Sequence, residues 1–271
     1  IDYNDVKNYS FATTKVSSSS SMSNNDAYRM TLQTTNNLTY NGKWGDHALT
    51  ATAVYEATQS EYRYMNISGN NLMTESVGWW NVEMAGTRNA KNDYSKWALM
   101  SGVGRVMYNY KDRYMLTGTI RADGSSKFAS NNRWGFFPAG ALAWRLSNED
   151  FMQDIPWISN LKLRLSYGTS GNDRIDADLY QKLYGVSSKT PAGWGEISRY
   201  YYQFYNTKYV YNPNVKWETT ITRNLGFDFG FFKERLSGTV DIYWNTVKDL
   251  LVPSDIPGYT GYTKLMTNVG Q

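Results

Sequence analysis

Residues 224–245 read NLGFDFGFFKERLSGTVDIYWN, and apolar and polar residues alternate along most of this segment. Apolar side chains occupy alternate positions of two adjacent segments: Leu225, Phe227, Phe229 and Phe231 in the first, and Leu236, Val240, Ile242 and Trp244 in the second. Side chains of a strand point to opposite faces with a period of two, so each segment has one apolar and one polar face. Only four residues separate the segments, which predicts a β-hairpin with a charged tip. Asp and Asn opposite so many large aromatic side chains are typical of a membrane-embedded β-barrel.

The composition supports a membrane barrel and excludes a helical membrane protein. Of the 271 residues, 16% are aromatic and only 19% are charged, whereas soluble domains average about 25% charged residues. Aromatic girdles at the two membrane–water interfaces explain both deviations. The mean hydropathy is −0.58, and no run approaches the roughly 18 apolar residues that a spanning helix needs. The closed barrel is the other structure that can span lipid, since it pairs every backbone polar group.

The sequence offers little material for catalysis. It contains no cysteine, hence no disulfide or thiolate chemistry, and one histidine, His47, whose Trp-Gly-Asp-His context predicts a solvated turn. A nucleophile–base–acid triad cannot be built around it. The net charge of +4 is dispersed, without the Lys/Arg cluster of a nucleic-acid binder. We therefore expect no enzymatic activity, no cofactor and no nucleic-acid partner. The ends of the sequence, without a signal peptide, suggest a piece of a longer protein.

Further alternating segments predict six more strands, at about residues 28–40, 48–62, 97–108, 114–121, 133–146 and 161–167. Loops are expected at residues 1–25, 66–94 and 252–267, and over roughly forty residues after strand 161–167. Short and long connections alternate, as do the periplasmic turns and external loops of an outer-membrane barrel. Ten residues at about 3.3 Å each, tilted near 45°, span roughly 23 Å, close to the apolar band of such barrels.

Several ordered motifs carry a family resemblance. They are residues 121–128 (RADGSSKF), 132–138 (NRWGFFP), 158–164 (ISNLKLR), 166–168 (SYG), 171–172 (GN), 212–214 (NPN), 217–218 (WE), 224–229 (NLGFDF) and 248–251 (KDLL). Over about residues 100–271 the chain thereby resembles the SusC/RagA-like TonB-linked outer-membrane transporters of Bacteroidetes. The first hundred residues are compatible with this family but contain few of its motifs.

The resemblance implies an all-β fold, an antiparallel transmembrane β-barrel of about 22 strands in the cell outer membrane. Residues 1–271 would supply about eight of these strands, and the plug domain and TonB box are absent from this stretch. The implied function is active import of an oligosaccharide or a peptide, powered by TonB through a part of the protein outside this chain. A SusD-like surface lipoprotein is the implied partner at the mouth of the barrel.

Candidate site residues follow from the two faces of the strands and from the loops. Five charged residues are expected to face the barrel interior, where they pair with one another or contact substrate: Glu56, Arg121, Arg164, Asp228 and Asp241. Loop aromatic residues can stack on sugar rings, which favours an oligosaccharide slightly: Trp79, Trp80, Trp194, Tyr200, Tyr201 and Tyr202. Interface girdle or packing against the lipoprotein is their alternative role. Three carboxylates offer oxygen ligands for Ca²⁺ but lack the EF-hand spacing and flank Arg174: Asp173, Asp176 and Asp178.

Two other interpretations remain open. A stand-alone eight-stranded barrel, acting as an adhesin or a hydrolase, can close by itself. Its terminal strands would be paired with each other, whereas this chain begins and ends in loop-like sequence. A soluble glycan-binding β-sandwich would have to cover the aromatic faces of residues 225–244 with a second sheet. The identity of the substrate, oligosaccharide or peptide, is not decided by the sequence.

Overall fold

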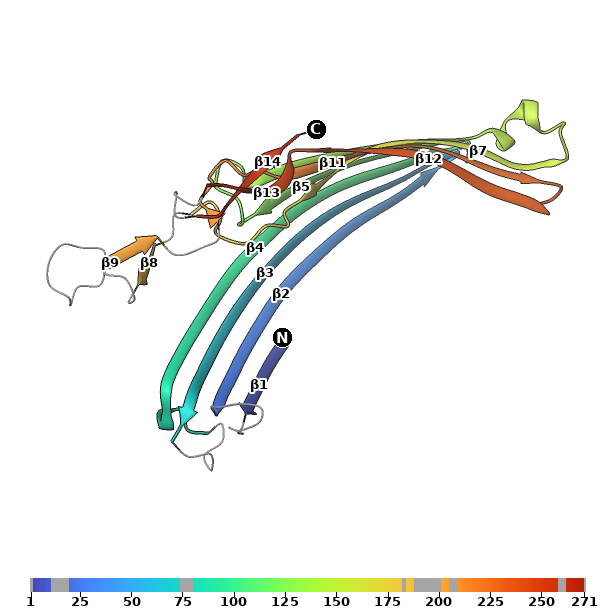
Figure 1. Ribbon diagram of the computed structural model, residues 1–271. Coiled ribbons are helices and arrows are strands. Elements are labelled where there is room, and N and C mark those ends of the chain that lie inside the picture. The colour runs from blue at the N-terminus through green and yellow to red at the C-terminus, as the bar shows by residue number, and fades with distance from the viewer. Residues whose placement is uncertain are drawn as a thin grey trace. The chain divides into compact units, whose positions relative to one another are not determined.

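The computed structural model describes residues 2–10, 20–73, 80–181, 184–187, 201–204, 209–257 and 262–270, and this part of the chain is mostly β-strand. Nine strands form one antiparallel sheet in the order β1-β2-β3-β4-β5-β6-β7-β11-β12 (Figure 1). Their bounds are β1 (Asp2–Ser10), β2 (Ser21–Trp44), β3 (His47–Leu72), β4 (Ala85–Tyr110), β5 (Tyr114–Ser125), β6 (Trp134–Arg145), β7 (Ile158–Asn172), β11 (Glu218–Phe231) and β12 (Leu236–Lys248). The predicted all-β architecture is confirmed.

Smaller elements complete the described structure. A three-stranded sheet has the order β10 (Tyr209–Val210), β14 (Lys264–Val269) and β13 (Leu250–Asp255), and β8 (Tyr184–Ser187) pairs with β9 (Tyr201–Phe204). Three single turns of 3₁₀-helix are η2 (Val82–Met84), η3 (Leu146–Asn148) and η4 (Asp150–Met152). Among the described helices, none has the length and apolar composition needed to cross a membrane.

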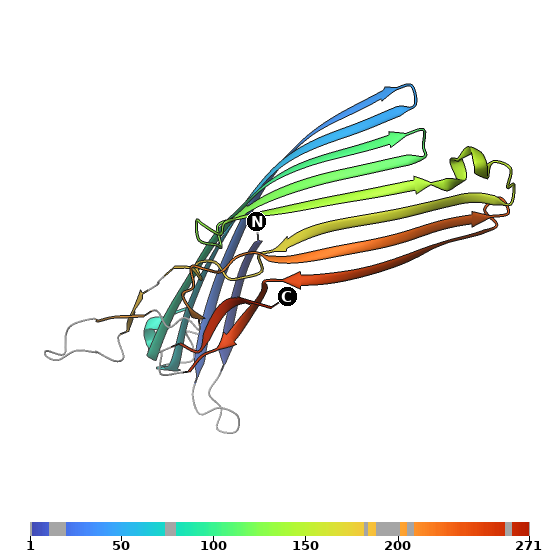
Figure 2. The same cartoon turned by 90° about the horizontal axis from the view of Figure 1, so that it is seen from above.

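The chain divides into two compact units. Unit 1 comprises residues 1–34 and 58–98, and therefore contains β1 and parts of β2, β3 and β4. Unit 2 comprises residues 35–57 and 99–271. In unit 2, strands β5, β6, β7, β11 and β12 lie side by side (Figure 2).

The strand register of unit 2 builds a continuous apolar row across five strands. Directly paired neighbours are Leu116 on β5, Leu142 on β6, Leu165 on β7, Leu225 on β11 and Ile242 on β12. Their exposed fractions lie between 37% and 58%. No second protein layer covers this row in the described part of the chain. Because contiguous exposed apolar surface is unfavourable in water, the row contradicts the soluble sandwich and fits a lipid-facing wall.

Burial along β6 shows the same division residue by residue. Trp134, Phe136 and Leu142 are exposed by 50%, 67% and 56%, whereas Phe137 is 4% exposed. The strand thus presents large apolar side chains to one side and packs the intervening residues on the other. Because successive side chains of a strand point to opposite faces, exposed apolar and buried residues alternate along the sequence of β6.

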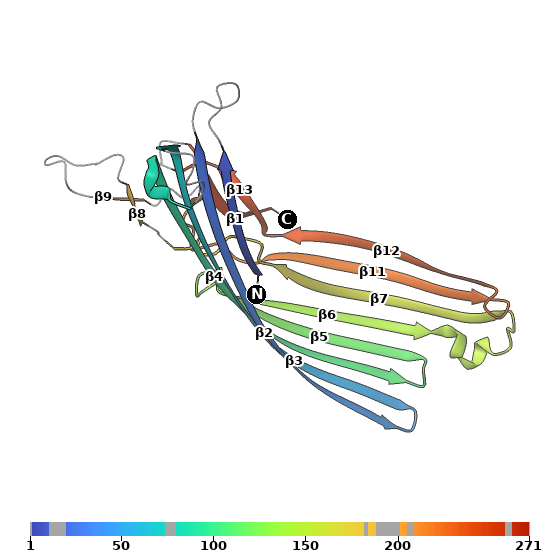
Figure 3. The ribbon, with the colours of Figure 1, turned by 90° about the horizontal axis from the view of Figure 1, so that it is seen from below.

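Tight turns connect the strands of unit 2 at one end of the sheet, as predicted (Figure 3). Residues 45–46 join β2 to β3, residues 111–113 join β4 to β5, and residues 232–235 join β11 to β12. Backbones at Gly45, Lys111, Asp112, Phe232 and Lys233 have positive φ, which is the conformation that closes short hairpins. The β6–β7 connection is longer and contains η3 and η4.

Three predicted loops are wrong. Residues 2–10 form β1, which pairs with β2 from Asp2↔Arg29 to Ser10↔Ser21. The expected loop 66–94 is mostly strand, since β3 continues to Leu72 and β4 begins at Ala85, and residues 252–267 contribute to β13 and β14. Strands β2, β3 and β4 have 24 to 26 residues, far more than the roughly ten that cross the apolar band. Their additional residues lack the apolar alternation on which the prediction depended.

Candidate functional site

Arg164 links three strands on the face opposite the apolar row. From β7 its guanidinium donates to Asp228 on β11, with Nη2···Oδ1 at 2.8 Å and Nε···Oδ2 at 3.0 Å. The same Nη2 lies 3.2 Å from Asp241 Oδ2 on β12. Thr239 adds a hydrogen bond from its hydroxyl to Asp228 Oδ1 at 3.1 Å. Three of the five charged residues predicted to face the interior are thus brought into one network.

Gly226 makes room for this network. It is paired directly with both Arg164 and Asp241. A Cβ added at Gly226 would lie 2.6 Å from Asp241 Oδ1 and 2.7 Å from Arg164 Cζ, closer than side-chain atoms tolerate. The glycine therefore lets the Arg164 side chain cross β11 and reach β12. Because the Arg164 and Asp241 side chains remain about a third exposed, the pair adds little to stability and keeps a charged, hydrated surface.

Arg121 anchors a second polar group on the sheet. Its Nε lies 2.7 Å from Asp123 Oδ2, and its Nη2 donates to Ser101 Oγ on β4 at 3.2 Å. Glu56 on β3 interacts electrostatically with Arg121. Asp123 is part of β5 and is 6% exposed. Asp123 was not predicted as a partner of Arg121, although a spacing of two residues in a strand places both on one face.

Unit 1 carries a polar and aromatic surface that the sequence analysis also missed. Asn66 Nδ2 donates to Asn25 Oδ1 at 2.6 Å and to Ser23 Oγ at 3.0 Å, and the Tyr64 hydroxyl donates to Asn25 Oδ1 at 2.9 Å. Nearby on the same two strands, the Arg29 guanidinium lies 5.1 Å from the centre of the Tyr62 ring. Residues 21–25 had been expected in a loop, and Asn66 at the start of another. Amide and hydroxyl groups beside aromatic rings are suited to binding sugar hydroxyls and ring faces.

The family motifs meet in one buried cluster of unit 2. We call this set the motif cluster: Phe128, Phe137, Ile175, Val215, Trp217 and Met266. The Trp217 ring lies 5.2 Å from that of Phe128 and 5.6 Å from that of Phe137, and its indole N–H donates to the Arg133 carbonyl at 3.0 Å. Gly171 has no side chain where the Phe137 ring lies, and a Cβ there would overlap it.

Polar contacts tie the motif cluster to its neighbours. Glu218 accepts from Asn172 Nδ2 and from the Leu251 backbone N–H, both at 2.9 Å. Ser125 donates to Asp173 Oδ2 at 2.9 Å. The motifs 121–128, 132–138, 171–172, 217–218 and 248–251 therefore act together as a structural unit that joins the ends of β5, β6, β7 and β11 to the β10-β14-β13 sheet.

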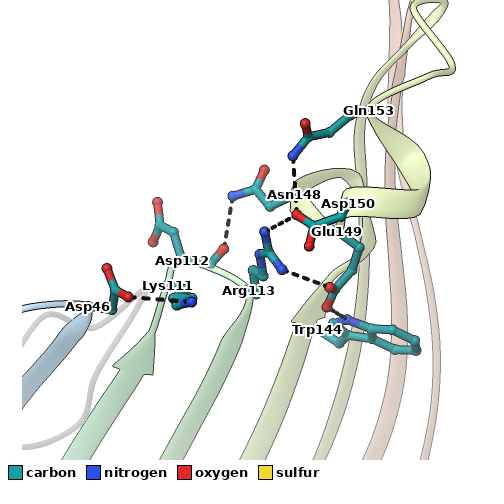
Figure 4. Close-up of polar contacts among 9 residues, drawn as sticks. All are labelled: Asp46, Lys111, Asp112, Arg113, Trp144, Asn148, Glu149, Asp150 and Gln153. Carbon is teal, nitrogen blue, oxygen red and sulfur yellow. Dashed lines mark hydrogen bonds and ion pairs between the residues drawn. The ribbon is translucent and has the colours of Figure 1, made fainter.

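Charged side chains also link the tight turns of unit 2 (Figure 4). Arg113, the last residue of the β4–β5 turn, lies 3.2 Å from Glu149 Oε2 and 2.6 Å from Asp150 Oδ1 in the β6–β7 connection. Trp144 donates from its indole N–H to Glu149 Oε1 at 2.9 Å. Hydrogen bonds from Tyr114 and Trp144, and the charge of Arg113, hold the pKa of Glu149 below its ordinary value of 4.5. These contacts stabilise the ionised form of Glu149, a residue that is only 8% exposed.

Most of the predicted loop aromatics cannot be placed. Trp79, Trp194 and Tyr200 lie outside the described residues, and Tyr201 and Tyr202 are described only as backbone of β9, paired with β8. Trp80 lies in a bend before η2 and is 80% exposed. Its contact with substrate stays a prediction.

The calcium hypothesis receives no support, because no three acidic or histidine side chains gather into a metal-binding group within the described ranges. Asp173 instead pairs with Ser125 and with Lys127, whose Nζ lies 3.7 Å away. Burial raises the pKa of Asp178.

His47 is not the solvated turn residue that the sequence predicted. It begins β3, its Nδ1 lies 2.6 Å from the Tyr108 hydroxyl, and its ring lies 4.8 Å from that of Tyr110.

Comparisons with known proteins agree with this geometry. A family model described as "TonB dependent receptor-like, beta-barrel" matches residues 1–271. The TonB-dependent receptor SusC of Bacteroides thetaiotaomicron is 41% identical over 175 residues, which is 64% of this chain and 17% of SusC. The TonB-dependent receptor P3 of Formosa agariphila is 34% identical over 248 residues, 90% of this chain and 24% of P3.

Among solved structures, that of the RagAB peptide transporter matches with a TM-score of 0.82 and 25% identity over 94% of this chain and 28% of that one. The chain thus spans at most 24% of the length of the curated relatives it matches.

Proposed function

The chain belongs to the TonB-dependent receptor β-barrel family and is part of an outer-membrane transporter of SusC/RagA type; from this premise we propose that the whole protein imports an oligomeric nutrient. TonB supplies the energy through a part of the protein outside residues 1–271. The observation that carries the proposal is the two-faced wall of unit 2. The apolar row through Leu165 and Leu225 suits lipid, and the ion-paired network of Arg164, Asp228 and Asp241 suits a water-filled interior.

A SusD-like surface lipoprotein is the proposed partner. Support comes from the 41% identity with SusC and from the similarity to the structure of the RagAB peptide transporter. Such a lipoprotein covers the mouth of the barrel and delivers the nutrient to it. Transport of this kind needs no catalytic chemistry from the barrel itself.

An oligosaccharide is our first candidate cargo. The exposed Trp80 and the Asn25, Tyr64 and Asn66 group of unit 1 offer a ring face and several hydrogen-bonding groups to a sugar chain. A peptide is the second candidate, favoured by the likeness to RagAB, whose structure is described as a peptide transporter. Neighbouring genes provide a first discrimination: glycoside hydrolases indicate sugar and peptidases indicate peptide.

Uptake by cells tests both candidates directly. A strain that lacks the full-length gene is complemented with wild-type protein and supplied with fluorescent oligosaccharides or peptides of matched size. We expect uptake of one oligosaccharide class to depend on the gene, on TonB and on the lipoprotein. Uptake of peptides alone would replace the first candidate by the second, and TonB-independent uptake of either would contradict the proposed function.

Trp80→Ala should lower oligosaccharide uptake by about twofold to tenfold, since stacking of a ring on an aromatic side chain contributes roughly 0.5–1.5 kcal/mol. Phe151→Ala is the matched control, because Phe151 lies in η4, in the connection between β6 and β7, and is also well exposed, by 62%. Surface levels of both variants are measured by whole-cell immunoblotting. Equal uptake by both variants at equal surface level would exclude Trp80 from substrate binding.

A further inference from the structure

Arg223 is a cation on the apolar face of unit 2. On β11 it shares its face with Leu225 and Phe227, two and four residues further along, and it is paired directly with Tyr167 on β7 and Trp244 on β12. Tyr167 and Trp244 are exposed by 48% and 52%. An arginine in this position faces the membrane rather than the ion-paired interior that holds Arg164.

The surroundings of Arg223 leave its charge uncompensated. Its Nη1 donates to the Thr246 hydroxyl at 3.2 Å, and its guanidinium carbon lies 5.9 Å from the centre of the Tyr167 ring. Neither contact carries a negative charge, and within the described structure no carboxylate forms an ion pair with it. By contrast, Arg113, Arg121, Arg145 and Arg164 each pair with at least one carboxylate. A lipid-facing cation is tolerated near an interface, where an anionic group can meet it.

The depth of Arg223 places it near the outer leaflet. It lies eight residues from Phe231, the end of β11 at the tight turns. Eight residues at about 3.3 Å each, tilted near 45°, rise roughly 19 Å. The apolar band of an outer-membrane barrel is about 25 Å tall, with aromatic girdles at its two borders. Tyr167 and Trp244 are suited to the outer girdle, and Arg223 lies between them.

An open groove of about 590 Å³ extends from Arg223 along the apolar face. Leu116, Leu142, Leu165 and Leu225 line it, and Gly140 forms part of its floor. A Cβ at Gly140 would meet only the Thr117 carbonyl oxygen, at 3.8 Å, so a larger residue would fit between the strands. The glycine at this position leaves the groove open. The groove is therefore a shallow, apolar channel with a cation at one end, matching a lipid that has an acyl chain and an anionic head group.

We propose that this surface binds a phosphate-bearing glycolipid of the outer leaflet, the lipid A part of lipopolysaccharide. A lipid A phosphate pairs with the Arg223 guanidinium, and one acyl chain lies in the groove against Leu165 and Leu225. The rings of Tyr167 and Trp244 flank the head group at the membrane border. Lipid A is the occupant rather than a phospholipid because the cation lies toward the outer leaflet, where glycolipid carries the anionic groups.

The test measures lipid binding to the purified full-length protein after delipidation in detergent. The thermal midpoint of unfolding is followed as lipid A, enzymatically dephosphorylated lipid A or phosphatidylethanolamine is added. We expect lipid A to raise the midpoint at the lowest concentrations. Arg223→Gln should weaken the apparent affinity for lipid A about fivefold, the factor that one cation near a lipid phosphate contributes, and Arg223→Lys should retain most of it. Arg235→Gln removes an exposed cation at the tip of the same hairpin and should change nothing.

Three outcomes would overturn the proposal. Equal affinity of wild-type protein for lipid A and its dephosphorylated form excludes phosphate recognition, and this comparison needs no variant to fold. An equal response to phosphatidylethanolamine indicates a general lipid surface. Native mass spectrometry that finds barrel dimers in place of bound lipid, broken by Arg223→Gln, assigns the groove to a second copy of the protein.

Discussion

Leu225 and Gly226 are neighbours on β11, yet their surroundings differ completely. Leu225 is 37% exposed between Leu165 and Ile242, whereas the buried Gly226 lies between Arg164 and Asp241. One step along the strand thus leads from an apolar row to an ion-paired network. An uncovered apolar row of this length is unfavourable on a sheet in water. It is favourable on a sheet whose one face contacts hydrocarbon.

A charge introduced on the apolar face should therefore be costly. We predict that Leu225→Arg destabilises the barrel by about 2–4 kcal/mol, the cost of an arginine near the middle of the band. Thr239→Arg, on the polar face of β12, should cost far less than this. Denaturant-induced unfolding of the full-length protein in lipid vesicles measures both changes. Similar penalties for the two variants would show that the facing assignment is wrong.

Glu149, which contacts Arg113 and Trp144 at the tight turns, should make the stability of the protein depend on pH. Its pKa is lowered in the folded protein by Tyr114, Trp144 and Arg113, so the ionised carboxylate favours the folded state at pH values above its ordinary pKa of 4.5. This contribution is lost as the pH falls below 4.5 and through the lowered folded-state value. We expect Glu149→Gln to lower the thermal midpoint of unfolding at pH 7, and the difference from wild type to shrink below pH 4.5. A difference that persists unchanged to pH 3 would contradict the ionised state.

At the scale of elements, the motif cluster explains why the family motifs are spread over more than a hundred residues. Trp217 lies just before β11 and packs on Phe128 and Phe137 from the β5–β6 region, and Glu218 binds the backbone of Leu251 on β13. Motifs far apart in the sequence are thus neighbours in the fold. These motifs hold β13 and β14 against the ends of the long strands. This structural role explains them without any contact with substrate.

Removal of the Trp217 ring should loosen this assembly. We predict that Trp217→Ala costs about 3–5 kcal/mol of local stability, as expected for a buried tryptophan. Hydrogen exchange of the Leu251 and β14 amides should accelerate, while β7 and β12 amides near the tight turns stay protected. Trp217→Phe retains most of the packing and loses the hydrogen bond to Arg133, so its effect should be smaller. Unaltered exchange in β13 and β14 would show that the cluster does not anchor them.

The sequence predicted elements well where lipid imposes a pattern. The hairpin of residues 225–245, strand 133–146 and the tight turns were found because one face of each strand is apolar and the other polar. The pattern fails in β1 and in residues 21–25, 63–72 and 85–96. There the strands are polar on both faces, as in Asp2-Tyr3-Asn4-Asp5, so their composition resembles that of a loop. Backbone hydrogen bonds pair the strands in these segments, and such bonds form whatever the side chains are. The side-chain pattern therefore does not reveal these strands.

The candidate site was predicted in part for a similar reason. Alternation alone placed Arg164, Asp228 and Asp241 on one face, but their meeting depends on the register of β7, β11 and β12 and on the space above Gly226. The Asn25, Tyr64 and Asn66 group escaped notice because Asn25 and Asn66 lie in segments read as loop. The strand pairing of β2 with β3 brings Asn25 together with Tyr64 and Asn66, which lie 39 and 41 residues further along the chain.

For the whole molecule, the central claim is that the wall of unit 2 separates hydrocarbon from water. The family assignment, the apolar row and the ion-paired opposite face support this conclusion, and the lipid groove proposed at Arg223 depends on it. The interior network keeps water along the inner face, and the aromatic residues mark the borders of the membrane. Such a wall can enclose a hydrated path, which the proposed import of a large polar nutrient requires.

Spin labels at two adjacent positions on β7 can show whether the two faces of the wall meet hydrocarbon and water. The chain has no cysteine, so spin labels are attached at Leu165→Cys or Ser166→Cys in the full-length protein, free of other reactive cysteines, in lipid vesicles. Oxygen concentrates in hydrocarbon, and a nickel chelate stays in water. The label at position 165 should collide mainly with oxygen, and the label at position 166 should be far less accessible to oxygen relative to the chelate. Oxygen accessibility that is equal at both positions, or higher at position 166, would contradict the claim.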